Sequence, residues 1–186
     1  MRKLQILKGL FLLFSFLVVV EGVFLTEGAT KETESKAKKE RNIYTTWHGN
    51  LEVDKCGSAW LIKRFIDKEA KFKFFKHGTL IKEGIPFDTP TAKLRQSRNM
   101  STFEVIIQKY KIDDPVIDRI AKIVRDIEIN IWGEKVTEEA LGLQAIIRGL
   151  NLISKDDYEC LERSFIVFDA LYADVKSQAD FEKKER

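Results

Sequence analysis

The sequence predicts a mainly α (α+β) fold, a helical domain of about five helices with a small β element near its N-terminal end. Apolar residues recur at spacings of three and four along much of the chain, which is the period of an amphipathic helix. The 186 residues include 13 Phe but only ten Gly and three Pro, which disfavours an all-β fold joined by tight turns. A chain that is 44% hydrophobic can bury the core of one domain.

The first 22 residues have the layout of a secretory signal peptide. Arg2, Lys3 and Lys8 form a basic start, and a short apolar run from Leu10 to Val20 follows. This run falls short of the roughly 20 residues that a membrane-spanning helix needs. We therefore expect an exported protein, periplasmic or extracellular, with no membrane span after signal cleavage. Anchoring to the membrane by an uncleaved signal is the alternative.

A charged linker is predicted over residues 23–42, because most of it alternates both signs of charge without a bulky apolar side chain. The folded domain is expected over residues 43–175, followed by a polar tail over residues 176–186 that frays. Signal cleavage removes three basic residues and one acidic residue from totals of 32 and 29, so the mature chain is nearly neutral. This balance argues against a nucleic-acid partner.

The β element is predicted from two short patterns. Residues 43–47 are β-branched and aromatic, and residues 71–76 alternate basic and apolar side chains. We expect residues 85–88 to pair with residues 71–76. Their place is the sheet edge, because Pro86 cannot donate a ladder hydrogen bond.

Five polar residues are each predicted to cap the start of a helix, because apolar side chains follow them at helical spacing. They are Asp54, Ser101, Asp114, Thr137 and Ser154. The first helix is expected to reach about Ile66. Glu104 completes a capping box, and Pro115 suits a first helical turn. We expect Phe65 and Ile131 to point inward from their helices.

One string of residues resembles a known family. VDKCGSAWLIKRFID (residues 53–67), preceded by YTTW, resembles the opening signature of the ChrB-like chromate resistance family. Further blocks follow in the expected order: IPFD at 85–88, STFE at 101–104, IVRDIEI at 123–129, EEALGLQAIIRGL at 138–150 and FDALY at 168–172. The resemblance spans about residues 44–174. Within this family the chain resembles the exported single-domain branch, whose members are similar to the ChrB C-terminal domain.

The resemblance implies a role in chromate or metal-oxyanion resistance, without a defined reaction. Members of the family often carry His at the position of Arg125, and His or Cys within the stretch that is 95–101 here. Carboxylates persist, Asp88 among them. They suggest a site that binds a divalent metal ion through oxygen ligands. The candidate metal ligands are Glu104, Asp126, Glu139 and Asp169.

Each of these four carboxylates also has a structural interpretation. Glu104 can bond the backbone of its own capping box, and Glu139 is favourable in a first helical turn without any function. Asp126 can belong to a solvated flank beside Lys122. Asp169 lies beside an aromatic stripe, where partial burial would require a partner.

A basic site is the alternative to a carboxylate site. Lys55, Lys63 and Arg64 lie in one predicted helix and could donate to an oxyanion, or they could be solvated. Cys56 would lie in a first helical turn, where the dipole can lower a thiol pKa. Cys56 and Cys160 are therefore interpreted as buried free thiols, as a disulfide, or as a reactive thiol.

Three functions are consistent with the sequence. The first is an exported protein that binds a metal ion or oxyanion through a carboxylate-rich site. The second is an enzyme, such as a reductase of chromate or another small substrate, and the third is a helical protein-interaction module. The sequence has no nucleotide-binding or flavin motif, so a divalent metal ion is the one cofactor considered. His48 and His77 show no ligand spacing, and the oligomeric state is left open.

Overall fold

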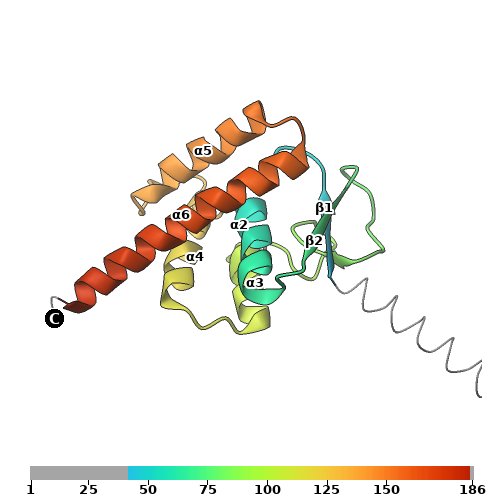
Figure 1. Cartoon of the computed structure of the whole chain (residues 1–186). Coiled ribbons are helices and arrows are strands. Elements are labelled where there is room, and N and C mark those ends of the chain that lie inside the picture. The colour runs from blue at the N-terminus through green and yellow to red at the C-terminus, as the bar shows by residue number, and fades with distance from the viewer. Residues whose placement is uncertain (1–41, 185–186) are drawn as a thin grey trace, which may run out of the picture. The chain divides into compact units, whose positions relative to one another are not determined.

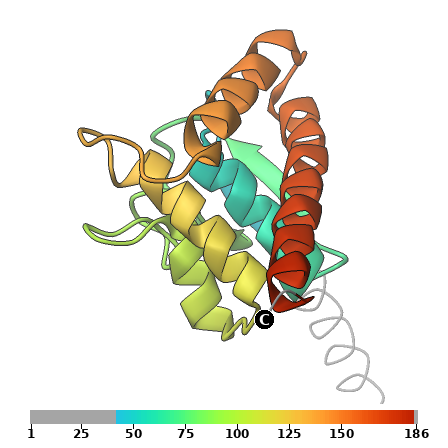
Figure 2. The same cartoon turned by 90° about the vertical axis from the view of Figure 1, so that its left-hand side faces the viewer.

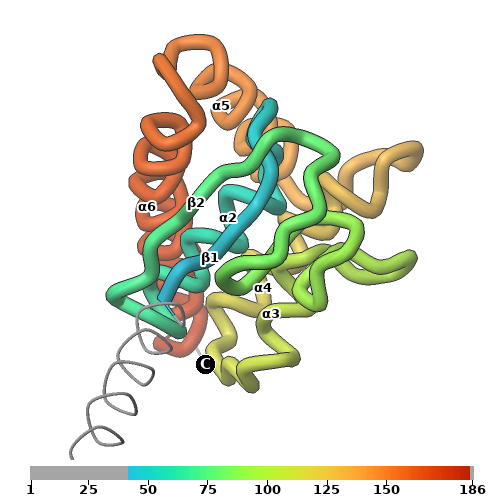
Figure 3. The backbone as a smooth tube through the Cα atoms, turned by 90° about the vertical axis from the view of Figure 1, so that its right-hand side faces the viewer, coloured from blue at the N-terminus to red at the C-terminus, as the bar shows by residue number. Residues whose placement is uncertain are grey.

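The computed structural model describes residues 42–184. The predicted signal peptide and nearly all of the predicted linker lie outside these residues. The described part has five α-helices and a small three-stranded parallel sheet formed near its N-terminal end (Figure 1). The predicted α+β class is therefore confirmed. Figure 3 shows β1 and β2 side by side, with α6 along one side of them and α3 and α4 toward the other.

The central strand of the sheet is β1 (Ile43–Trp47), as the β-branched pattern predicts. Both β2 (Lys71–Phe75) and β3 (Ile85–Pro86) pair with β1 in parallel, in the order β2-β1-β3. The predicted pairing of residues 85–88 with β2 is therefore wrong. Strand β3 does lie at the sheet edge, as predicted. At an edge, the missing N–H of Pro86 does not cost the sheet a hydrogen bond.

Helix α2 (Val53–Leu61) lies at the centre of the fold, and all nine of its residues are buried. It contacts α3, α4, α5 and α6, and Figure 2 shows it between α4 and α6. Gly57 allows this packing, because a Cβ there would lie 2.9 Å from Phe168 and 3.2 Å from Phe103. Close packing of the helices thus explains why glycine occupies position 57.

The start of α2 differs from the predicted one, whereas the helical stretch that it begins ends at Ile66 as predicted. Asp54 is a buried residue of the first turn, and Glu52 occupies the N-cap position without a side-chain bond. The chain continues from α2 as one stretch of π-helix, Ile62–Ile66. Phe65 in this stretch is 38% exposed, so the expectation that it points into the core is wrong.

The next two helices begin as their capping signals predict. Helix α3 (Thr102–Tyr110) has a complete capping box between Ser101 and Glu104. Helix α4 (Pro115–Glu128) is capped by the Asp114 side chain. Ile131 lies beyond the end of α4 and is exposed, which contradicts its predicted place on the buried face.

Helices α5 (Glu139–Ile153) and α6 (Asp157–Lys184) complete the fold. Neither begins at the predicted cap: Glu138 holds the N-cap position of α5, and the Asp156 carboxylate accepts from the N–H of Glu159 at 2.9 Å in α6. Helix α6 extends through most of the predicted polar tail. Within residues 42–184, none of the helices combines the length and apolarity that crossing a bilayer requires.

Candidate functional site

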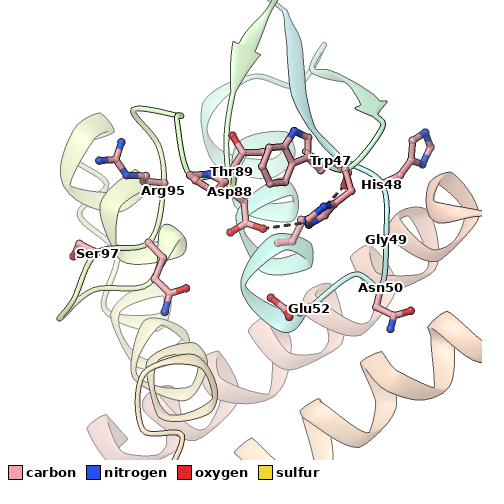
Figure 4. Close-up of a pocket in the computed structure, with 13 residues that line it drawn as sticks. Trp47, His48, Gly49, Asn50, Glu52, Asp88, Thr89, Arg95 and Ser97 are labelled. Atoms are coloured by element: carbon pink, nitrogen blue, oxygen red, sulfur yellow. Dashed lines mark hydrogen bonds and ion pairs between the residues drawn. The ribbon is translucent and has the colours of Figure 1, made fainter. Parts of the chain in front are cut away.

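A polar pocket of about 570 Å³ lies at the carboxyl ends of the three strands. Its wall comes from the β1–α2 loop, from His77 after β2 and from Asp88 after β3, with Lys55 of α2 and part of the loop before α3. Figure 4 shows two of these segments, one carrying Trp47 to Glu52 and the other Asp88 to Ser97. Parallel strands place their carboxyl ends at one edge, where α/β folds bind ligands.

Lys55 is the buried cation of this pocket. Its side chain is 11% exposed, and its Nζ lies 3.7 Å from Asp88 Oδ2. The same Nζ donates to the carbonyl oxygen of Trp47 at 3.4 Å. Both contacts are long for an ammonium group that has three protons to place. The Lys55 ammonium therefore retains capacity to donate to a small acceptor in the pocket.

Asp88 is held in an uncommon backbone conformation. Its φ of 49° is left-handed, a region that Asp enters more readily than most residues. Its backbone N–H donates to the Leu94 carbonyl at 2.8 Å, and its Oδ1 accepts from Thr102 Oγ1 at 2.9 Å. These bonds fix the Asp88 carboxylate between Lys55 and the start of α3.

Two further carboxyl groups lie behind the pocket wall. Asp54 is 2% exposed and accepts from the backbone N–H groups of Thr102 and Phe103. Burial, followed by the nearby Asp88, raises the Asp54 pKa well above its usual range. Glu128 Oε1 accepts from the Asp54 N–H at 3.2 Å, and burial together with Asp54 raises the Glu128 pKa to about 8. Two carboxyl groups close to the pocket therefore have raised pKa values.

The chain's two imidazoles also line this pocket. His48 Nδ1 lies 2.8 Å from Asp157 Oδ2, which ties the end of β1 to the start of α6. The ring of His77 packs on Trp47 with 4.7 Å between ring centroids. His48 and His77 are far apart in the sequence, so the sequence alone did not place them in one site. It did not place Glu52 there either, although Glu52 lines the same pocket. The signal that could have revealed the shared site is that His48 and His77 each closely follow a strand, once parallel pairing is recognised.

Two of the predicted metal ligands take part in structural contacts of α4. Glu104 accepts from the Ser101 N–H and from Arg125 Nη1, each at 2.9 Å. Asp126 is 3% exposed and accepts from Asn130 and from residues 136 and 137 of the next loop. Burial acts to raise the Asp126 pKa, but these hydrogen bonds outweigh it and lower the pKa to about 2.

The other two predicted ligands form ion pairs elsewhere. Glu139 Oε1 lies 3.3 Å from Arg119 Nη2. Asp169 accepts two bonds from Arg64, at 2.9 and 2.7 Å, and one from Trp60 Nε1 at 2.7 Å. Each of the four predicted carboxylates therefore has its own contacts, and the structure does not bring the four together in one site. Over residues 42–184, no group of three or more His, Cys, Asp and Glu side chains is arranged to hold a metal ion.

The three predicted oxyanion donors also separate. Lys55 lines the pocket, whereas Lys63 Nζ donates to the Ala70 carbonyl at 2.9 Å and Arg64 is committed to Asp169. Cys56 and Cys160 are both buried free thiols. Burial raises the Cys56 pKa to about 12, which is opposite to the lowering expected from a helix N-terminus.

Comparison with known proteins assigns the folded domain to a family. Residues 44–175 match the family model described as ChrB, C-terminal domain, so the chain belongs to this family. The chain is 27% identical to Protein ChrB of Cupriavidus metallidurans over 130 residues. The aligned region makes up 69% of this chain and 39% of that protein. No solved structure shows a significant match. Family membership suggests a role in chromate resistance.

Proposed function

We propose that this protein serves a chromate-resistance system by binding a small tetrahedral oxyanion in the pocket at the carboxyl ends of the strands. The observation that carries the proposal is the Lys55 side chain, which is 11% exposed and whose ammonium has only long contacts to Asp88 and Trp47 among the described residues. A buried cation is costly unless strong acceptors surround it. An oxyanion oxygen within hydrogen-bond distance would supply such an acceptor.

Neutral donors on the pocket wall support the same proposal. Four residues with neutral polar side chains line the pocket: Asn50, Thr89, Gln96 and Ser97. Hydroxyl and amide groups can donate to several oxygens of one tetrahedral anion, while the Lys55 ammonium supplies a charge-assisted bond. Chromate and sulfate share this shape and charge, so sulfate is a redox-inert probe of the site.

A cation is the second candidate ligand, and one observation favours it. Asp88 and Glu52 line the same pocket as His48 and His77, which gives oxygen and nitrogen atoms of the kind that bind transition metals. These four side chains are not arranged as a metal site in the described residues, so a metal would have to draw them together. In the described structure the Lys55 ammonium lies next to Asp88, in the position that a bound cation would occupy. Metal binding would require this ammonium to move away or lose its proton.

The two ligands are distinguished by isothermal titration of the purified chain with sulfate, chromate and Mn²⁺. For an oxyanion site, we expect Lys55→Met to lower sulfate and chromate affinity at least tenfold, and Asp88→Asn to raise it by removing a repelling charge. A cation site predicts that Asp88→Asn abolishes Mn²⁺ binding. Lys63→Met is the matched control, because Lys63 bonds the Ala70 carbonyl outside the pocket. Unchanged oxyanion affinity in Lys55→Met would contradict the main proposal.

We further propose that the protein is exported. The support is the basic and apolar pattern of residues 1–22, which lie outside the described structure. Cell fractionation combined with intact-mass measurement tests this directly. A periplasmic or secreted product that lacks the first 22 residues is expected. A full-length product in the membrane fraction would support the uncleaved anchor instead.

A further inference from the structure

Helix α5 is apolar on two opposite faces. Its inner face buries Ala140, Leu143 and Ile147 in the core. Its outer face exposes Leu141 by 62% and Leu152 by 86%. Figure 1 shows α5 at the margin of the described domain, with α6 alongside it. Because helices that are apolar all round are normally buried, the outer face of α5 calls for a partner.

The outer face has the spacing of a coiled-coil seam. Leu141, Ala145, Arg148 and Leu152 follow one another at intervals of four, three and four residues, and Glu138 precedes Leu141 by three. This alternation keeps one narrow stripe in line along the helix, which is the arrangement that two paired helices share. The stripe holds apolar residues together with one acidic and one basic residue.

Two glycines beside this stripe have no role within the described fold. A Cβ added at Gly142 or Gly149 would meet nothing within 4 Å, and neither residue has a positive φ. Glycine inside a helix weakens it relative to alanine, so packing in the described domain gives no reason for the choice. Missing side chains do allow another backbone to approach closely. This observation is independent of the exposed leucines.

We propose that the outer face of α5 binds the same face of a second copy, with the two helices antiparallel about a two-fold axis near residue 143. In this register Leu141 of each copy lies opposite Ala145 of the other, so that a large side chain meets a small one. Glu138 of each copy then lies opposite Arg148 of the other, and both are exposed in the described structure. This charge complementarity favours a second copy over an unrelated partner.

The same register explains an unusual loop. Leu152 falls opposite the segment around residue 134, which precedes α5 and lies between Trp132 and Val136. Trp132 is 97% exposed and Val136 is 83% exposed. In the pair, this loop of one copy would cover Leu152 of the other. A closed two-fold interface therefore accounts for the apolar residues at both ends of α5.

Sedimentation velocity of the purified chain over a hundredfold concentration range tests the proposal. A monomer–dimer equilibrium is expected, and Leu152→Glu and Gly142→Leu are each expected to raise the dimer dissociation constant at least tenfold. Leu80→Glu is the control, because Leu80 is 60% exposed in the loop between β2 and β3, away from α5. A monomer at every concentration, or a dimer unaffected by both α5 variants, would overturn the proposal.

Charge reversal tests the register itself. Glu138→Arg and Arg148→Glu should each weaken the dimer several-fold, because each places like charges opposite one another. The double variant Glu138→Arg/Arg148→Glu restores the opposite pairs and should recover dimerisation. Failure of the double variant to recover, with circular dichroism unchanged, would exclude the antiparallel register centred near residue 143.

Discussion

Asp54 of α2 caps a different helix from its own. Its carboxylate accepts from the backbone N–H of Thr102 at 2.6 Å and of Phe103 at 2.8 Å, which are the first two residues of α3. The next N–H of α3, that of Glu104, donates to Ser101 Oγ at 3.2 Å. Two caps from separate parts of the chain therefore satisfy the start of α3, and one of them joins it to the central helix.

Removing the Asp54 carboxylate should destabilise the whole domain. In Asp54→Ala, the buried N–H groups of Thr102 and Phe103 lose their acceptor, and we expect a loss of about 2–4 kcal/mol in the free energy of unfolding. Asp54→Asn keeps one acceptor oxygen and should cost less. Urea unfolding followed by circular dichroism measures both. Equal stability of wild type and Asp54→Ala would show that this cap does not stabilise the fold.

The acids behind the pocket predict a stability that falls as the pH rises. The pKa of Glu128 is raised from 4.5 to about 8, and that of Asp54 is also raised, so the folded state binds more protons than the unfolded state between about pH 4.5 and 8. Stability is therefore lost as the pH rises across this window.

Urea titrations at several pH values test this dependence. Glu128→Gln cannot gain a charge, so its stability should vary less over the same window. A wild-type stability that rises between pH 5 and 8 would contradict the predicted direction.

Asp126 predicts the opposite dependence at acidic pH. Its pKa is lowered from 3.8 to about 2 in the fold, so its contribution is present above about pH 4 and is lost as the pH falls toward 2. Asp126→Ala should lose about 2 kcal/mol at neutral pH, because Val136 and Thr137 lose their acceptor. The same variant should be less sensitive to acid between pH 4 and 2, as thermal unfolding can measure. An unchanged acid sensitivity would assign the acid response to other groups.

Gly57 should be intolerant of even one methyl group. In Gly57→Ala the new Cβ would lie 2.9 Å from Phe168, in a position where α2 is buried on all sides. We expect a loss of about 1–3 kcal/mol from overpacking. At a protein concentration where the chain is monomeric, Gly149→Ala is the control, since its Cβ meets nothing within 4 Å in the described domain and alanine favours the helix. Equal effects of the two substitutions on the melting temperature would refute the packing argument.

Local signals in the sequence predict the elements that depend on local interactions. The Ser101–Glu104 capping box and the Asp114–Pro115 start are confirmed because all their partners lie within a few residues. Asp54 resembles a cap of the same kind, but its partners are 48 and 49 residues away. Spacing within one helix cannot reveal a bond of that length.

The candidate site was predictable only in part for the same reason. Lys55 lies both in the predicted donor set and in the pocket, whereas Glu104 and Asp126 have short-range structural partners that their local sequence also allowed. His48 and Asp88 come together because β1 and β3 pair in parallel. That pairing places both carboxyl ends at one edge, and the sequence pattern pointed to a different partner for β3.

Thr102 links the pocket wall to the interior of the domain. Its hydroxyl donates to Asp88 at 2.9 Å while its backbone N–H donates to Asp54, so one residue connects the pocket wall with the buried cap of α3. An ion that pulls Asp88 away from Thr102 would withdraw a bond from the first turn of α3. A change at the pocket wall would therefore reach the residue at which Asp54 caps α3, inside the protein.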